Sequence, residues 1–227
     1  MPSPNILKTY VKGGYYHIYN RGVAKQHIFL DSKDYHVFLS YLKDALIKPI
    51  PKSFKKIEVS FKGQTFKGIP RPVNNYFDKI SLVCYCLMPN HFHLVVQQTE
   101  ISSMQNFMKS VSTRYSQYFN KRYDRIGPLF QGRYKAALIT DDHYLLHLSR
   151  YIHLNPLGMV KSLESAYSSY SNYLGTRNTS WINPNIVLEF FNKNKDVQFK
   201  NNLTYKSFVE DIKINSKKAL GKKAIDW

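Results

Sequence analysis

The sequence has few cysteines, few acidic residues and no long apolar run. Its two cysteines, Cys84 and Cys86, cannot build a disulfide framework, which suits a reducing cytoplasm. No apolar run approaches the length of a membrane span, and the first residues lack the apolar core of a signal peptide. We therefore expect a cytoplasmic protein that does not cross a membrane.

The shortage of acidic residues leaves a large positive charge. Only 15 Asp and Glu stand against 33 Lys and Arg in 227 residues, for a net charge of +18. This charge indicates a polyanion as partner, with nucleic acid and a place on the nucleoid as the first interpretation. A ribosomal or membrane-surface protein would share this balance. The 18 Tyr suit stacking on unpaired bases, although an AT-rich genome also favours tyrosine.

The first half of the chain predicts a strand, a helix and an irregular segment. Aromatic and β-branched residues predict a strand over residues 15–22. Asp31 is a predicted helix N-cap, and apolar residues at helical spacing continue to Leu46, before two prolines. Residues 53–77 are rich in Lys, Gly and Pro. We interpret them as an inserted hairpin or loop, in which residues 57–61 pair with residues 65–66.

The next elements complete a recognisable order. Strands are predicted at residues 80–86 and 91–96, a helix from Ser102 or Ser103 to residue 123, and a strand over residues 130–139. The order strand, helix, strand, strand, helix, strand predicts a ferredoxin-like α+β fold. This fold is one antiparallel sheet with helices on one face, which leaves the other face open for a site.

Two further regions follow the sheet. A helix over residues 143–155 is predicted, capped by Asp141 or Asp142 and stopped by Pro156. Residues 161–227 form a predicted extension that is basic and mostly helical. Helices are expected near residues 168–175, 183–191 and 205–209, before a lysine-rich tail.

The most informative stretch is Met-Pro-Asn-His-Phe-His at residues 88–93. Residues two apart in a strand share a face, so His91 and His93 project together. Two imidazoles can hold one divalent cation when a third ligand comes from elsewhere. Strand histidines satisfied by hydrogen bonds are the alternative. Cys84 and Cys86 also share a face and leave a Cys/His zinc site open, but burial of two small residues explains them more simply.

The helix at residues 143–155 carries the second group of candidates. Positions four apart share a helix face, which groups His147, Tyr151 and Asn155 away from an apolar stripe of leucines and Ile152. Asn155 precedes a proline, where helical geometry is disfavoured. Taken alone, this pattern favours a Tyr and an Asn that form local hydrogen bonds at a helix end.

Four motifs in this order resemble a known family. The motifs are residues 16–22 (YHIYNRG), 87–95 (LMPNHFHLV), 127–134 (GPLFQGRY) and 151–157 (YIHLNPL). The sequence resembles the IS200-like single-tyrosine transposases of the HUH superfamily, and it is most similar to their REP-associated branch. The resemblance covers about residues 10–160, which makes this region the expected catalytic domain. Two departures are Phe130, where Trp is frequent, and the long segment at residues 53–77.

The resemblance implies a metal-dependent DNA strand-transfer enzyme. His91, His93 and Asn155 would hold Mg²⁺ or Mn²⁺, and Tyr151 would be the nucleophile, with His147 as a candidate general base. Attack on single-stranded, hairpin-bearing DNA would give a 5′-phosphotyrosine and a free 3′-OH, and rejoining would need no ATP. The protein would act in transposition and recombination, as a monomer or as a homodimer.

Recognition of DNA would need basic side chains beside the site. The candidates are Arg21, Arg114, Arg122, Arg125 and Arg133, although each alone also fits a solvated surface position. Two other functions stay open. The chain could be a domesticated nucleic-acid-binding protein that performs no transposition, or a metal-dependent RNA endonuclease that forms no protein adduct.

Overall fold

A four-stranded antiparallel sheet lies at the centre of the computed structural model, which describes residues 9–49, 57–61, 63–68, 73–192 and 204–211. The strands are β1 (Tyr15–Arg21), β4 (Ile80–Met88), β5 (His91–Gln98) and β6 (Lys135–Ile139). Their order in the sheet is β4-β5-β1-β6, which is the ferredoxin-like order when only these four strands are counted. The predicted fold class is confirmed.

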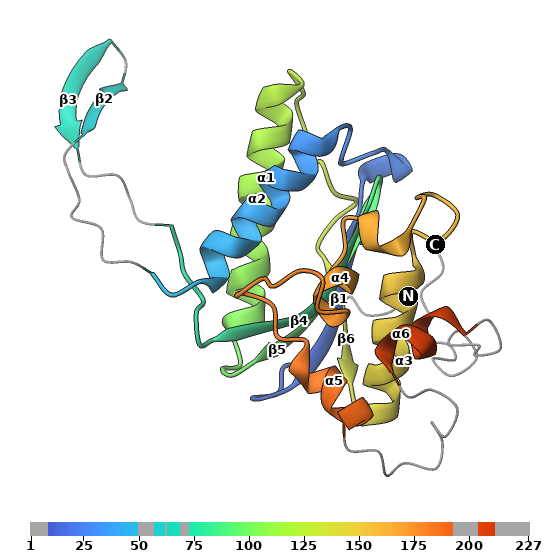
Figure 1. Cartoon of the computed structure of the whole chain (residues 1–227). Coiled ribbons are helices and arrows are strands. Elements are labelled where there is room, and N and C mark those ends of the chain that lie inside the picture. Colours follow the sequence, from blue (N-terminus) through green and yellow to red (C-terminus); the bar gives the residue numbers. More distant parts are fainter. Residues whose placement is uncertain (1–8, 50–56, 62, 69–72, 193–203, 212–227) are drawn as a thin grey trace, which may run out of the picture.

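Two helices cover one face of this sheet. Helix α1 (Ser32–Leu46) follows the predicted N-cap Asp31, and α2 (Ser103–Arg122) has almost the predicted bounds. Their apolar stripes pack on alternate residues of the strands, among them Phe92 and Leu94 of β5. Figure 1 shows the two helices side by side on this face. Phe130, at the position where Trp is frequent in relatives, meets Phe92 edge-on with ring centroids 5.9 Å apart.

The opposite face of the sheet is covered, which corrects the prediction of an open face. Helix α3 (Asp142–Leu154) packs there through the predicted apolar stripe of Leu145, Leu148 and Ile152. Its N-cap is Asp141, and Asn155 keeps helical angles (φ −51°, ψ −41°) despite the proline that follows it. The sequence pattern identified the buried stripe, but it could not show which sheet face the helix would occupy.

Two strands differ in length from the prediction. Strand β4 continues to Met88, with a register shift between Leu82 and Cys84. Strand β6 begins only at Lys135, although residues from 130 onward were predicted to be extended. The chain before it makes an isolated bridge from Phe130 to Gly22, and Gly132 has φ +150°, a value that L side chains rarely adopt. These contacts bend the segment out of the sheet.

The inserted segment contains the predicted hairpin. Strand β2 (Ile57–Phe61) pairs with β3 (Gln64–Gly68) in a separate two-stranded sheet. Figure 1 shows this hairpin standing apart from the main sheet. The predicted pairing of residues 57–61 with residues 65–66 is confirmed.

The described part of the C-terminal region packs against α3 and β4. It contains α4 (Tyr170–Tyr173), α5 (Asn185–Asn192) and α6 (Tyr205–Glu210), as well as the short 3₁₀ helix η2 (Leu163–Ser165). A second 3₁₀ helix, η1 (Val23–Lys25), follows β1. The lysine-rich tail lies outside the described residues. Among those described, no helix combines the length and the apolar character needed to cross a bilayer.

Candidate active site

Four predicted site residues meet on the α3 face of the sheet. The rings of His91 and His93, both on β5, have centroids 5.0 Å apart, and the Tyr151 ring of α3 lies 6.0 Å from that of His93. Asn155 donates its amide N–H to the Tyr151 carbonyl oxygen over 2.9 Å, and its side chain also forms a hydrogen bond with His91. The strand pair and the helix end therefore come together within one chain.

The hydrogen bond of His91 with its neighbour fixes its tautomer. His91 Nδ1 lies 2.6 Å from Asn90 Oδ1, while the amide nitrogen of Asn90 donates to the Lys25 carbonyl oxygen over 3.3 Å. Because Oδ1 can only accept, His91 Nδ1 carries the proton in this hydrogen bond. The lone pair of the neutral imidazole is then on Nε2.

His93 lies deeper and has an unexpected neighbour. His93 Nδ1 lies 2.9 Å from Nε2 of His17, a β1 residue that the sequence analysis did not select. Both side chains are fully buried. His93 Nε2 has no hydrogen-bond partner among the described residues. A buried ring nitrogen without a partner, beside a second imidazole, is an observation that a bound cation would explain.

Burial keeps these imidazoles neutral. It lowers the pKa of His91 to about 4, with a further lowering by Arg21 and a partial offset by the hydrogen bond with Asn155. Burial also lowers the pKa of His93 well below its usual value, and His17 and His91 act in the same direction. A histidine binds a metal only in its neutral form, so both side chains are in the ligand state at neutral pH.

The residues present fit a divalent cation with two imidazoles and one amide oxygen. Across the described residues, no group of three or more His, Cys, Asp and Glu side chains is placed to hold a metal ion. Asn155, whose side chain forms a hydrogen bond with His91, lies where the resemblance places a third ligand. Burial raises the thiol pKa of Cys84 and of Cys86, which disfavours the thiolates that a Cys/His zinc site would need.

Two cations lie beside the histidines. Arg21 is opposite His91 in the β1–β5 register, and its Nε donates to Gln131 Oε1 over 2.5 Å. Lys135 begins β6, and its Nζ lies 5.9 Å from the centre of the Tyr19 ring. Burial lowers the pKa of Lys135, and the charge of Arg21 adds to this effect. The alternation of β1 places Tyr19 and Arg21 on the His91 face, but sequence reasoning did not use this signal and missed Lys135 entirely.

Four of the five predicted DNA-binding arginines have side-chain partners within the protein, since Arg21 donates to Gln131 and three others are paired as follows. Arg122 pairs with Asp31 and Asp34 at 2.6 Å each, and Arg114 pairs with Asp44 at 3.1 Å. Arg125 donates to Gln26 and Asn120. Arg133 is exposed, and Arg21 is beside the site. The structure thus separates arginines that tie helices together from arginines that face the candidate site or solvent.

His147, the candidate general base, is placed away from the solvent. It is buried, and its ring lies 4.4 Å from that of His143 and 5.6 Å from that of Phe208 in α6. The sequence analysis grouped His147 away from the apolar stripe of α3, but α6 covers the side on which His147 lies, so this side chain is buried. Burial lowers its pKa to about 4, with smaller contributions from His143 and Arg150.

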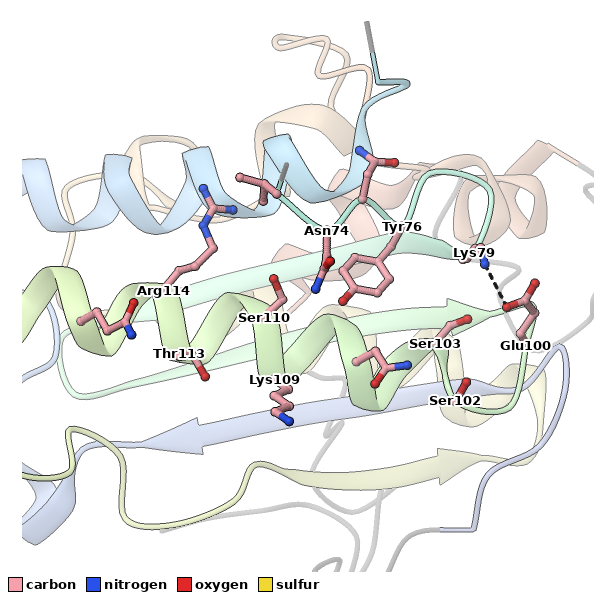
Figure 2. A pocket seen from close by; sticks show the side chains of 14 residues that line it. Asn74, Tyr76, Lys79, Glu100, Ser102, Ser103, Lys109, Ser110, Thr113 and Arg114 are labelled. Atoms are coloured by element: carbon pink, nitrogen blue, oxygen red, sulfur yellow. Dashed lines mark hydrogen bonds and ion pairs between the residues drawn. The ribbon is translucent and has the colours of Figure 1, made fainter. Parts of the chain in front are cut away.

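A large polar pocket lies elsewhere, between α2 and the segment before β4. It has a volume of about 1030 Å³ and is lined by Tyr76, Lys79, Lys109 and Arg114, among others. Figure 2 shows Lys109 and Arg114 on α2 and Tyr76 on the segment before β4, with Lys79 paired to Glu100. Helix α2 covers the sheet face opposite α3. This pocket is therefore separate from the histidine and tyrosine site.

Comparison with known proteins finds one matching family and several similar solved structures. Residues 62–155 match the family described as "Transposase IS200 like", which confirms the resemblance inferred from the motifs. The solved structures that match include a REP-associated tyrosine transposase bound to a REP hairpin, with 12% identity and a TM-score of 0.49, covering 80% of this chain and 98% of that one. Another is a candidate transposase from Deinococcus radiodurans, with 13% identity and a TM-score of 0.36, covering 67% and 95%. No curated protein matches the chain.

Proposed function

Because residues 62–155 match the IS200-like transposases, we propose that this protein cuts and rejoins single-stranded DNA through Tyr151. The observation that supports this proposal most directly is the approach of the Tyr151 ring to 6.0 Å from His93 within the same chain. A phenol, two neutral imidazoles and an amide on one face can carry out phosphoryl transfer without a residue from a second subunit.

The nucleophile would be the phenolic oxygen of Tyr151. It attacks the phosphorus, the bond to the 3′ oxygen breaks, and the DNA is left as a 5′-phosphotyrosine with a free 3′-OH that has gained a proton. Attack by the 3′-OH of another strand reverses these steps and releases Tyr151. The covalent ester conserves the energy of the broken bond, so rejoining needs no ATP.

His91, His93 and Asn155 would hold a divalent cation, Mg²⁺ or Mn²⁺. When bound, such a cation withdraws charge from a phosphate oxygen and orients the phosphate for attack. The neutral state of both histidines at pH 7 supports this role, since only the neutral ring offers a lone pair. The hydrogen bond between Asn155 and the Tyr151 carbonyl oxygen couples the ligand to the backbone of the nucleophile.

The proton of Tyr151 needs an acceptor, because a phenol has an unperturbed pKa of about 10. His147 lies one turn before Tyr151 on α3 and stays the predicted base. Burial lowers its pKa to about 4, so it is neutral at pH 7 but only a weak base toward a phenol. Because the His147 ring packs against His143 and Phe208, solvent is the other proposed acceptor of the Tyr151 proton.

The proposed substrate is single-stranded DNA that carries a hairpin. The net charge of +18 supports a nucleic acid as the partner, and Arg21 and Lys135 lie beside the histidines, where a phosphate would enter. The hairpin itself follows from the resemblance to the REP-associated branch. A cytoplasmic location on the nucleoid, and action as a monomer or homodimer, are parts of the same proposal.

Incubation of the full chain with Mn²⁺ and labelled hairpin oligonucleotides tests the proposal. We expect a covalent protein–DNA adduct on a denaturing gel, absent in Tyr151→Phe and in metal-free buffer. Tyr144→Phe is the matched control, because it removes another hydroxyl from the same helix, and its adduct yield should be unchanged. An adduct that persists in Tyr151→Phe would exclude Tyr151 as the nucleophile.

Two other outcomes would favour the alternative functions. Binding of hairpins that is independent of metal, without cleavage of any of them, would identify a domesticated binding protein. Cleavage of RNA but not DNA, with no protein adduct, would identify an RNA endonuclease. Parallel reactions with RNA and DNA of the same sequence separate these outcomes from strand transfer.

A further inference from the structure

His17 lies behind His93 as seen from the candidate site. It belongs to β1, and the β1–β5 register places it beside His93 on the α3 face of the sheet. The two rings are close to parallel, with an interplanar angle of 24° and centroids 5.1 Å apart. Both side chains have 0% exposure, so solvent does not compete for their hydrogen bond.

The hydrogen bond between the two rings has two possible directions. In the first, His93 Nδ1–H donates to His17 Nε2, and His93 Nε2 keeps its lone pair. In the second, His17 Nε2–H donates to His93 Nδ1, and His93 Nε2 carries a hydrogen. Only the first direction leaves a lone pair on the His93 nitrogen that has no partner among the described residues.

The other histidine of the pair shows the same construction. His91 Nδ1 donates to Asn90 Oδ1, and the His91 side chain also meets Asn155, the third proposed ligand. In each histidine, therefore, Nδ1–H would donate to a neighbouring side chain and Nε2 would keep the lone pair. Metal-binding histidines are usually oriented in this way, by an acceptor for the ring N–H that does not bind the metal.

We propose that His17 is a positioning residue that accepts the Nδ1–H of His93 and so holds His93 Nε2, with its lone pair, toward the bound cation. This role rests on the proposed metal-assisted function. His17 is not itself a ligand in this arrangement, because its Nε2 accepts from His93 and its Nδ1 then carries the hydrogen. His17 belongs to the YHIYNRG motif at residues 16–22, so this motif would help to orient a metal ligand on the neighbouring strand.

Nuclear magnetic resonance can determine which of His17 and His93 donates the hydrogen bond between them. In the full chain with ¹⁵N-histidine and Zn²⁺ as a diamagnetic probe, long-range ¹H–¹⁵N spectra should show His93 with a hydrogen on Nδ1 and a metal-bound Nε2. His17 should then carry its hydrogen on Nδ1. A hydrogen on His17 Nε2 in the metal-loaded protein would overturn the proposal.

Metal affinity provides a second, independent measurement. Mn²⁺ binding followed by electron paramagnetic resonance should weaken about 10- to 100-fold in His17→Leu, the range found when such orienting partners are lost. His17→Gln offers an amide oxygen as acceptor and should recover most of the affinity. Ile18→Ala is the matched control, because it opens a cavity at the neighbouring β1 position on the other face of the sheet. Its Mn²⁺ affinity should stay within about twofold of wild type, and thermal unfolding without metal checks that each variant is folded.

His93→Ala separates failure of this inference from failure of the proposed function. If His93→Ala loses Mn²⁺ binding while His17→Leu keeps wild-type affinity, the positioning role is wrong and the metal site stands. If His93→Ala also keeps wild-type affinity, both the positioning role and the metal site are wrong. Loss of affinity in His17→Leu with recovery in His17→Gln supports the proposal.

Discussion

The two faces of the central sheet bury very different chemistry. Under α1 and α2, the buried side chains are almost all apolar or aromatic, and Asp34 is a fully buried carboxylate with its own set of donors. Under α3, the core contains apolar residues together with buried polar ones. Those polar residues include His17, His93, His147, Ser149, Arg150 and His153.

The two faces of the sheet are therefore held together in different ways. Polar groups under α3 are linked by hydrogen bonds: His153 Nδ1 lies 2.7 Å from the Tyr205 hydroxyl, and His153 Nε2 lies 2.8 Å from Ser169 Oγ. Tyr205 also donates to Ser149 of α3 over 3.1 Å. The C-terminal elements thus hold the tyrosine helix on the sheet, whereas the α1/α2 face is held by its apolar core and by Asp34.

Loss of Asp34 should have the largest effect on stability and no effect on the site. Its carboxylate accepts from the Leu30 backbone, Tyr118, Tyr123 and Arg122. Asp34→Ala should lower the free energy of unfolding by about 3–5 kcal/mol, because it leaves buried donors without their acceptor. Urea denaturation measures this loss, and Mn²⁺ affinity of the folded variant should match wild type.

Asp44→Ala is the control for Asp34→Ala. Asp44 pairs with Arg114 but its side chain is 49% exposed, so the free energy of unfolding should change by about 1 kcal/mol or less. Equal effects of the two substitutions would contradict the interpretation of Asp34 as the anchor of the α1/α2 face.

Acid should destabilise the α3 face in part through His147. Its pKa is about 4 in the folded protein, below the ordinary value of 6.5, because burial disfavours the charged ring and His143 and Arg150 act in the same direction. The unfolded chain therefore binds the proton more readily. The contribution is fully present above pH 6.5 and is lost as the pH falls from 6.5 through 4, by about 3 kcal/mol.

His147→Leu tests this contribution. The free energy of unfolding, measured by urea denaturation between pH 7.5 and pH 4, should fall less steeply in His147→Leu than in the wild type. His27→Gln, at an exposed position, should leave the pH dependence unchanged. Equal slopes for His147→Leu and the wild type would show that His147 is protonated as easily in the folded chain as in the unfolded one.

Removal of one hydroxyl should weaken the attachment of the C-terminal elements. Tyr205→Phe leaves His153 and Ser149 without the hydroxyl between them and should lower the free energy of unfolding by about 1–3 kcal/mol. Tyr167→Phe is the matched control, because the Tyr167 hydroxyl has no hydrogen bond among the described residues. Thermal unfolding compares the two, and a Tyr205→Phe protein as stable as Tyr167→Phe would exclude this attachment.

The smallest expected effects concern DNA affinity. Arg133 is exposed after the bend that precedes β6, and Arg133→Ala should weaken binding of single-stranded DNA a few-fold and reduce the salt dependence by about one phosphate contact. Lys109→Ala, on the polar pocket of α2, should leave affinity unchanged. Fluorescence anisotropy at several salt concentrations measures both, and the reverse result would place DNA on the α1/α2 face.

Local sequence patterns predicted the elements well because the signals are themselves local. Asp31 and Asp141 cap α1 and α3 as expected, and the stripe of Leu145, Leu148 and Ile152 is buried. The predicted start of β6 was wrong, because Phe130 bridges to Gly22 and Gly132 turns the chain. Those contacts join residues about a hundred positions apart, which no short window of sequence contains.

By itself, the sequence determined the order of the elements and two pairs of proposed site residues, His91 with His93 and Tyr151 with Asn155. Each pair shares a face of its own strand or helix, and periodicity within one element is enough to show this. Only the tertiary structure decided that α3 brings these pairs together, that His17 lies behind His93, and that Arg122 is tied to Asp34. Such neighbours depend on strand register and on the sheet face that a helix covers, and both are set by packing between distant parts of the chain.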